Sequence, residues 1–191
     1  FGGKESQGKA LAVACAIAAH RTNKPCKMRY DRDDDMLITG KRHDFRITYR
    51  AGVDQHNKII ALEVVHYARC GWAQDLSLPV ADRAMLHADN AYFLPNVRIE
   101  SHRLKTNTQS ATAFRGFGGP QGVLGMERIM DHLAHDLNTD PIAFREMNYY
   151  RPAVAAEHDT THYHMSVQDF NLQEMTSKLL ADCDFENRKQ A

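Results

Sequence analysis

One stretch, at residues 112–122, constrains the fold of this chain more than any other, and its sequence is T-A-F-R-G-F-G-G-P-Q-G. It places four glycines and a proline directly before a segment with apolar residues at helical spacing. Glycine allows positive φ and close backbone approach, and proline suits the first turn of a helix. We therefore expect a tight loop that leads into a helix N-terminus, where backbone N–H groups and the helix dipole can hold an anion or an electron-rich oxygen.

This loop also carries side chains suited to ligand binding. Arg115 offers a cation with planar donors, and Phe114 and Phe117 offer flat apolar surfaces. A similar turn, F-G-G-K-E-S-Q-G, opens the chain at residues 1–8, and each turn precedes an apolar helical pattern that ends in Ala-His. The two turns could be copies whose helix N-termini converge on one ligand. The alternative is two ordinary tight turns before helices.

Length and composition limit the possible function classes. A chain of 191 residues with 43% apolar and 25% charged residues is typical of one large or two small soluble domains. Its formal net charge of zero gives no support to nucleic-acid or membrane-surface binding, and it has no apolar run long enough for a transmembrane helix. The four cysteines are scattered, which favours reduced thiols in a cytosolic protein. The chain starts at Phe1 without a methionine and ends in a polar run, so we expect a fragment of a longer polypeptide.

Hydrophobic periodicity predicts a mixture of helices and strands. The segment at residues 9–19 is rich in alanine, as in a buried and closely packed helix, and Asn171 with Glu174 matches a capping box. The pattern favours an α+β fold in which helices pack on a mixed, largely antiparallel sheet. Helices are expected at residues 9–19, 80–89, 121–135, 141–148 and 172–183, and strands at residues 26–30, 45–50, 59–67 and 96–106.

Several polar clusters allow a functional and a structural interpretation. Asp31, Asp33 and Asp35 alternate as in a calcium loop, but the glycine and glutamate that such a loop requires are missing, which favours a solvated or hydrogen-bonded turn. Three histidines could ligate a metal, yet no cysteine or second carboxylate completes their site, so a solvated segment is the favoured interpretation and no metal ligand is assigned. These histidines are His158, His162 and His164.

Five charged residues remain open as functional candidates. Asp75, Asp82 and Asp89 could transfer protons, although most surface carboxylates do not. Glu5 follows a glycine turn that could hold a ligand, and Arg83 could either pair with a neighbouring carboxylate or reach into a cleft.

Four segments together resemble the molybdenum-binding subunit of the xanthine dehydrogenase family, most of all the bacterial type with separate subunits. They are F-G-G-K-E at Phe1, D-R-D-D-D-M-L-I-T-G-K-R-H at Asp31, R-A-M-L-H-A-D-N-A-Y at Arg83 and K-T-N-T-Q-S-A-T-A-F-R-G-F-G-G-P-Q-G at Lys105. The resemblance implies that residues 1–150 form part of the first lobe of a molybdopterin-binding domain, and that residues 151–191 continue it with a C-terminal helix.

The resemblance also implies roles for six residues. Phe1, Gly2 and Arg115 would lie against a molybdenum–pyranopterin cofactor, and Phe117 would stack on the substrate ring. Glu5 would hydrogen-bond a purine. A sixth residue, Arg83, would stabilise negative charge on the purine carbonyl oxygen.

The implied reaction is hydroxylation of a purine in a cytoplasmic enzyme. Electrons would leave through iron–sulfur clusters and FAD on a partner subunit to NAD. The general base of the family belongs to a later molybdopterin-binding segment, so the 191 residues alone are expected to be inactive. Two alternatives remain: a relative that oxidises aldehydes or other N-heterocycles, and a scaffold module without catalysis. Because aldehyde-oxidising relatives usually carry apolar residues at the positions of Glu5 and Arg83, these two residues favour a purine.

Overall fold

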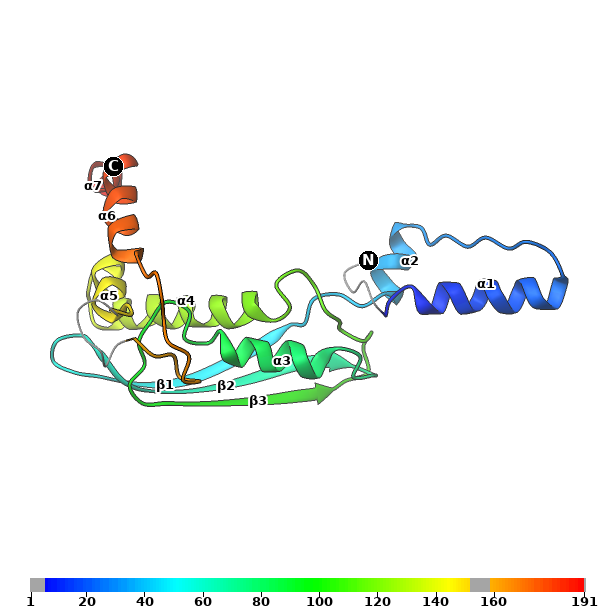
Figure 1. Cartoon of the computed structure of the whole chain (residues 1–191), viewed down its shortest axis with the longest axis horizontal. Helices are drawn as coiled ribbons and strands as arrows, with labels where there is room; N and C mark the ends of the chain where they lie inside the picture. The colour runs from blue at the N-terminus through cyan, green and yellow to red at the C-terminus, as the bar shows by residue number, and fades with distance from the viewer. Residues whose placement is uncertain (1–5, 152–158, 191) are drawn as a thin grey trace. The chain divides into compact units, whose positions relative to one another are not determined.

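The structure, a computed structural model, describes residues 6–151 and 159–190 and has the expected α+β composition (Figure 1). Its described elements are, in chain order, α1 (Lys9–Thr22), α2 (Arg32–Ile38), β1 (Phe45–Val53), β2 (Ile59–Gly71), α3 (Ser77–Leu86), β3 (Val97–Lys105), α4 (Gly119–Asp136), α5 (Pro141–Asn148), α6 (Leu172–Asp182) and α7 (Phe185–Gln190). Among the described residues, no helix is both long and apolar enough to cross a bilayer.

The three strands form one mixed sheet in the order β1-β2-β3. β1 and β2 are an antiparallel hairpin, closed where the Asp54 amide donates to the Lys58 carbonyl at 2.9 Å. β2 and β3 run in the same direction, and α3 lies between them in the sequence (Figure 1). We expected a largely antiparallel sheet, but one of its two pairings is parallel because a helix in the connection returns the chain to the starting end of the sheet.

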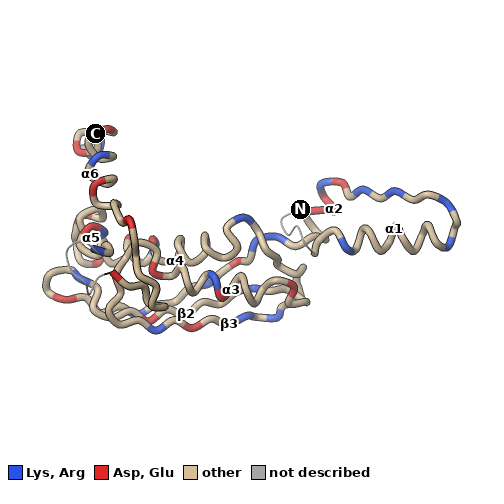
Figure 2. The backbone as a smooth tube through the Cα atoms, viewed as in Figure 1, with Lys and Arg blue, Asp and Glu red and all other residues tan. Residues whose placement is uncertain are grey.

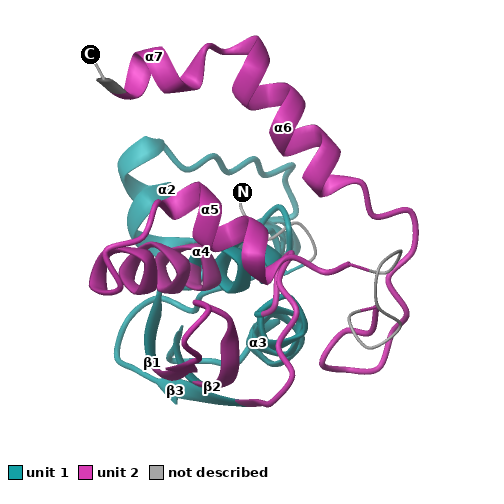
Figure 3. Ribbon diagram, turned by 90° about the vertical axis from the view of Figure 1, so that its left-hand side faces the viewer, with its two compact units in different colours: residues 1–48, 64–88, 99–124 teal, residues 49–63, 89–98, 125–191 magenta. Residues whose placement is uncertain are grey.

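The chain divides into two compact units that alternate along the sequence (Figure 3). Unit 1 comprises residues 1–48, 64–88 and 99–124, and unit 2 comprises residues 49–63, 89–98 and 125–191. Each strand and α4 therefore contribute residues to both units.

The core of unit 1 is formed by the buried face of β2 and by one face of α3. Every second residue of this part of β2 is buried, as expected for a strand with one covered face. On α3, Ser77, Val80, Ala81 and Ala84 are buried at spacings of three and four, which defines one helical face. The core of unit 1 includes Val64, His66, Ala68, Cys70, Val80, Ala81, Ala84, Ala111 and Ala113.

The core of unit 2 contains larger side chains than the core of unit 1. Its residues from α4 recur at the helical spacing that the sequence predicted. It contains Met126, Ile129, Met130 and Leu133 of α4, together with Phe144 of α5 and three tyrosines, Tyr92, Tyr149 and Tyr150. The expected start of α5 is confirmed as well. The Asp140 carboxylate accepts hydrogen bonds from the Ile142 and Ala143 amides at 2.9 and 3.0 Å, and Pro141 occupies the first turn.

Two predictions between residues 26 and 38 were wrong. Residues 26–30 form no strand, because none of the described strands pairs with them. The acidic turn forms a helix, α2, whose N-cap is Asp31: its carboxylate accepts from the Asp34 amide at 2.8 Å. Figure 2 shows basic residues before α2 and acidic residues in its first turn, where negative charge complements the helix dipole.

The expected helix near the N-terminus forms, but its environment differs from the prediction. α1 has no buried residue, and Val13 and Ile17 are 55% and 53% exposed. The alanine-rich pattern predicted the helix correctly and its burial wrongly, because a pattern cannot show whether a covering surface is present. Near the other end, α6 forms without the predicted Asn171 side-chain cap, and the polar run after it forms α7.

Candidate functional site

The glycine-rich loop that dominates the sequence forms a left-handed turn before α4. Gly116, Phe117 and Gly118 have φ values of 87°, 52° and 98°. The Phe117 amide donates to the Phe114 carbonyl at 2.7 Å, and the Gly119 amide donates to the Gly116 carbonyl at 2.9 Å. Left-handed backbone is uncommon for a phenylalanine and often marks a functional site. The predicted tight loop at a helix N-terminus is therefore confirmed.

This turn packs directly on the backbone of α3. A Cβ atom on Gly118 would overlap the Val80 carbonyl oxygen and would lie 3.1 Å from the Ala84 amide nitrogen. A Cβ atom on Gly122 would overlap the Ala84 carbonyl oxygen. The glycines thus let the start of α4 approach α3 more closely than any side chain would permit.

Arg83 lies on the exposed side of α3, one turn from these contacts. Its Nε donates to His87 Nε2 at 3.3 Å, so it does not pair with Asp82, whose carboxylate binds Arg103 instead. Because α3 touches the glycine turn, the structure brings the helix of Arg83 next to the turn of Arg115 and Phe117. Three of the six predicted site residues therefore belong to neighbouring segments of unit 1.

Arg42 also contacts the glycine turn, although the sequence had not indicated it as a site residue. Its Nη2 donates to the Arg115 carbonyl at 2.8 Å, and its guanidinium lies 4.5 Å from the centre of the Phe114 ring. Its buried Nη1 has no hydrogen-bond partner among the described residues. The signal was present, because Arg42 belongs to the K-R-H run that carries part of the family resemblance.

A buried polar pair lies next to the glycine turn. His43 Nε2 and Ser77 Oγ are 2.7 Å apart, and the Gln121 side chain donates to the His43 carbonyl at 3.3 Å. Burial, helped by the positive charge of Arg69, lowers the pKa of His43 and keeps the ring neutral at neutral pH. Gln121 Oε1 is buried and has no hydrogen-bond partner in the described part of the chain, so it is free to accept from a ligand.

Three of the predicted site residues, Phe1, Gly2 and Glu5, lie outside the described residues. The next residue, Ser6, donates from Oγ to Asp75 Oδ2 at 2.9 Å and lies 3.5 Å from Thr112 Oγ1. Thr112 leads into the second glycine turn. The described end of the first turn therefore lies beside the second, which supports the idea that both turns serve one site.

The remaining polar candidates have structural partners. Asp89 accepts a hydrogen bond from the Tyr150 hydroxyl at 2.7 Å and pairs with His162 Nδ1 at 3.3 Å. His164 is exposed, and His158 lies outside the described residues. In the part of the chain that the structure describes, no three histidine, cysteine or acidic side chains are grouped to hold a metal ion.

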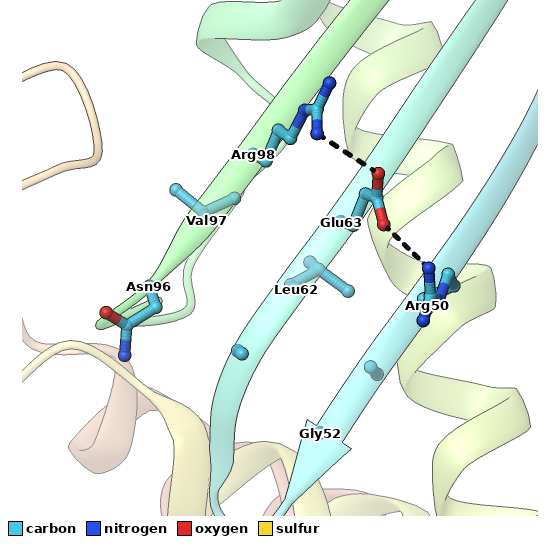
Figure 4. Close-up of a pocket in the computed structure, with 9 residues that line it drawn as sticks. Arg50, Gly52, Leu62, Glu63, Asn96, Val97 and Arg98 are labelled. Atoms are coloured by element: carbon cyan, nitrogen blue, oxygen red, sulfur yellow. Dashed lines mark ion pairs between the residues drawn. The ribbon is translucent and has the colours of Figure 1, made fainter.

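A separate groove in unit 2 crosses all three strands (Figure 4). Glu63 lies at its centre, with its carboxylate 3.6 Å from Arg50 Nη1 and 3.9 Å from Arg98 Nη1. The two arginine side chains are 87% and 70% exposed, and such ion pairs contribute little to stability. None of the candidate residues lines this groove.

The chain is similar in sequence to xanthine dehydrogenases. It is 40% identical over 189 residues to the xanthine dehydrogenase of Drosophila subobscura and 42% identical over 190 residues to the xanthine dehydrogenase/oxidase of Gallus gallus. These matches cover 99% and 100% of the chain, which spans only 14% of the length of either relative.

Solved structures agree with the sequence matches. The aldehyde oxidoreductase of Desulfovibrio desulfuricans superimposes with a TM-score of 0.82 at 29% identity, covering 97% of this chain and 20% of that one. The family model for the molybdopterin cofactor-binding domain matches residues 1–149. The glycine turn, α3 and Ser6 all lie within this range. The chain therefore belongs to the molybdopterin cofactor-binding domain family.

Proposed function

We propose that this chain is part of a xanthine dehydrogenase, in which it supplies substrate-binding residues and one wall of the cofactor site. The observation that carries the proposal is the close contact between the glycine turn and α3, which brings Arg115 and Phe117 into the neighbourhood of Arg83. Identity of about 40% to xanthine dehydrogenases supports it.

The described residues fit a molybdenum–pyranopterin. Such a group carries both hydrogen-bond donors and acceptors, and the neighbourhood of the turn offers one of each without a partner among the described residues: the buried Nη1 of Arg42 and the buried Oε1 of Gln121. Arg115 adds an exposed cation. We propose that Phe1, Gly2 and Arg115 hold the cofactor, which when bound supplies oxygen-transfer and two-electron redox chemistry.

The proposed substrate is a purine, oxidised from hypoxanthine to xanthine and then to uric acid. Phe117 would stack on its ring, and Glu5 would accept a hydrogen bond from a ring N–H group. Arg83 would donate to the carbonyl oxygen on which negative charge develops. A donor aimed at developing charge in a dry site lowers the barrier by about 3 to 4 kcal/mol.

The proposed site also needs further polypeptide. Arg83 and Arg115, the proposed site residues, are exposed in this chain. The apolar residues of α1 are not buried either. We propose that the remaining molybdopterin-binding segment covers them, that residues 151–191 continue the domain, and that an iron–sulfur and FAD subunit passes electrons to NAD in the cytoplasm. The 191 residues alone should not oxidise xanthine; turnover by the purified chain would contradict this part.

The test is xanthine-dependent NAD reduction by the complete enzyme. Arg83→Ala and Glu5→Ala should each lower turnover about a hundredfold or more with molybdenum still bound. Arg50→Ala is the matched control, because this arginine forms only an exposed ion pair on the sheet. If Arg50→Ala lowers turnover as much as Arg83→Ala does, the effect is not specific to Arg83. The proposed role of Arg83 in substrate binding would then be wrong.

The structural similarity to an aldehyde oxidoreductase favours a second candidate, oxidation of an aldehyde. The parent enzyme decides between them. If it ignores xanthine and oxidises an aldehyde, the purine assignment is wrong and the cofactor assignment stands. If it binds no molybdenum and oxidises neither, the chain serves as a scaffold.

A further inference from the structure

Asp75 has an unusual backbone and a crowded carboxylate. It lies two residues before α3 and has a φ of 43°, in the left-handed region that few residues other than glycine adopt. Burial alone would raise the pKa of Asp75, but hydrogen bonds from Thr112, Ser6 and the Leu76 amide outweigh burial and lower it. The carboxylate is therefore ionised at neutral pH, and it accepts a hydrogen bond from Ser6 Oγ at 2.9 Å, which itself lies 3.5 Å from Thr112 Oγ1.

Ser6, Thr112 and Leu76 belong to the segments that carry the proposed site. Ser6, which donates to Asp75 at 2.9 Å, directly follows Glu5. Thr112 is fully buried and lies three residues before Arg115. The Leu76 amide opens the segment that continues into α3. All three segments belong to unit 1.

We propose that Asp75 is a positioning residue whose carboxylate, through Ser6, holds the described end of the first glycine turn (residues 6–8) against the segment before the second glycine turn. The activity measurements below rest on the proposed function, whereas the hydrogen-exchange measurements do not. No contact between Asp75 and a substrate is implied, since it acts through Ser6 and Thr112.

The backbone around Thr112 shows which segment depends most on Asp75. The Thr112 amide donates to the Lys41 carbonyl at 2.9 Å, and the Ala111 amide donates to the Cys70 carbonyl at 3.0 Å. A Cβ atom on Gly71 would overlap the Gln109 carbonyl oxygen, so this segment is also closely packed. Loss of the carboxylate should therefore leave Thr112 in place and loosen chiefly the turn that contains Ser6, which is also held where Gln7 Oε1 accepts from the Gly40 amide at 2.5 Å.

The main variant is Asp75→Asn, which keeps the shape but removes the charge and one acceptor. In the complete enzyme with its cofactors, amide hydrogen exchange should speed up at residues 6–8 and stay unchanged at residues 109–113. Small displacements in an active site lower turnover by up to about a hundredfold, so we expect a fall in kcat with xanthine of tenfold to a hundredfold, with full molybdenum content. Asp182→Asn is the control, because its carboxylate is 60% exposed and pairs with Lys178 on the same helix, α6.

A double-mutant cycle separates positioning from general damage. If Asp75 acts through the first turn, Asp75→Asn should lower the turnover of Glu5→Ala only slightly further. In Arg83→Ala it should lower turnover by the same factor as in the parent, so that the two effects are additive in free energy. Additive effects on turnover with Glu5→Ala as well as with Arg83→Ala would overturn the proposal. Hydrogen exchange at residues 6–8 of Asp75→Asn equal to that of the parent would also overturn it.

Ser6→Ala removes the same hydrogen bond without altering Asp75. It should reproduce the faster exchange at residues 6–8, and it keeps the proposal testable if Asp75→Asn fails to fold; unchanged exchange in Ser6→Ala would then overturn it. Should the parent enzyme not oxidise xanthine, the proposed function fails while the exchange measurement still decides the role of Asp75.

Discussion

Two helices of this chain follow similar glycine-rich turns, yet they have opposite environments. α4 follows the turn at Gly116–Gly118 and buries Met126, Ile129 and Met130, whereas α1 follows the first turn and buries no residue. The glycines differ in the same way. A Cβ atom on Gly118 would overlap α3, while a Cβ atom on Gly8 would meet no atom within 4 Å.

The difference shows that a glycine-rich turn followed by an apolar helix specifies local geometry and leaves packing open. Around Gly118 helix α3 is close enough to require glycine, so the turn and the start of α4 pack against α3. Around Gly8 no such neighbour exists in the described part of the chain, and alanine-rich α1 buries no side chain. A helix of 14 residues that buries no side chain is only marginally stable in water.

The largest expected effect comes from adding one methyl group to each turn. Gly118→Ala should destabilise the chain by about 4 kcal/mol, because overlap with the Val80 carbonyl adds to the strain of a positive φ. Gly8→Ala, with a φ of −75° and open space, should be neutral or stabilise by about 0.5 kcal/mol. Urea unfolding of the two variants measures both changes, and equal effects would refute the distinction between the turns.

Truncating one apolar side chain in each helix tests the same contrast by burial. Met130→Ala should lower the free energy of unfolding by about 3 kcal/mol, since the side chain is fully buried and leaves a cavity. Ile17→Ala on α1 should change it by less than about 0.5 kcal/mol, because that side chain is half exposed. A large loss from Ile17→Ala would show that α1 is covered by another surface under the conditions of the measurement.

Acid should weaken the core and leave α1 unaffected. Burial lowers the pKa of His66 on β2 from its ordinary value near 6.5 to about 4. Between those two pH values the unfolded chain binds a proton that the folded chain does not, so stability is full above pH 6.5 and falls as the pH drops towards 4. The loss attributable to His66 is about 3 kcal/mol.

The control for the acid prediction is on α1. His66→Gln should flatten the dependence of the urea midpoint on pH in this window, although His43, whose pKa burial also lowers, leaves a remainder. Ile17→Ala, at a half-exposed position of α1, should leave the dependence as in the parent. An unchanged slope in His66→Gln would mean that this ring is not the group that titrates.

The smallest expected effect is local and leaves global stability unchanged. Amide hydrogens of α1 should exchange orders of magnitude faster than those of α4, because opening α1 exposes no buried side chain. Hydrogen exchange with mass spectrometry on the isolated chain measures this. Repeating the measurement in the complete enzyme shows whether further polypeptide protects α1; equal protection of α1 and α4 in the isolated chain would contradict the comparison.

The sequence alone determined the elements that depend on neighbours in the chain. It predicted the β1–β2 hairpin, the Asp140-Pro141 start of α5 and the apolar face of α4, because alternation, capping and helical spacing are local properties. The family resemblance and the glycine turn at residues 112–122 also came from sequence. The match to the molybdopterin cofactor-binding domain family confirms the resemblance.

Only the tertiary structure decided what depends on partners far along the chain. It showed the parallel pairing of β2 with β3, the uncovered α1, and the absence of a strand at residues 26–30. It also showed the hydrogen bonds of Arg42 and Asp75, whose partners lie 73 and 69 residues away. The physical reason is the same in each case: burial and hydrogen-bond partners depend on which segments meet in space, and a local pattern records only what one segment can offer.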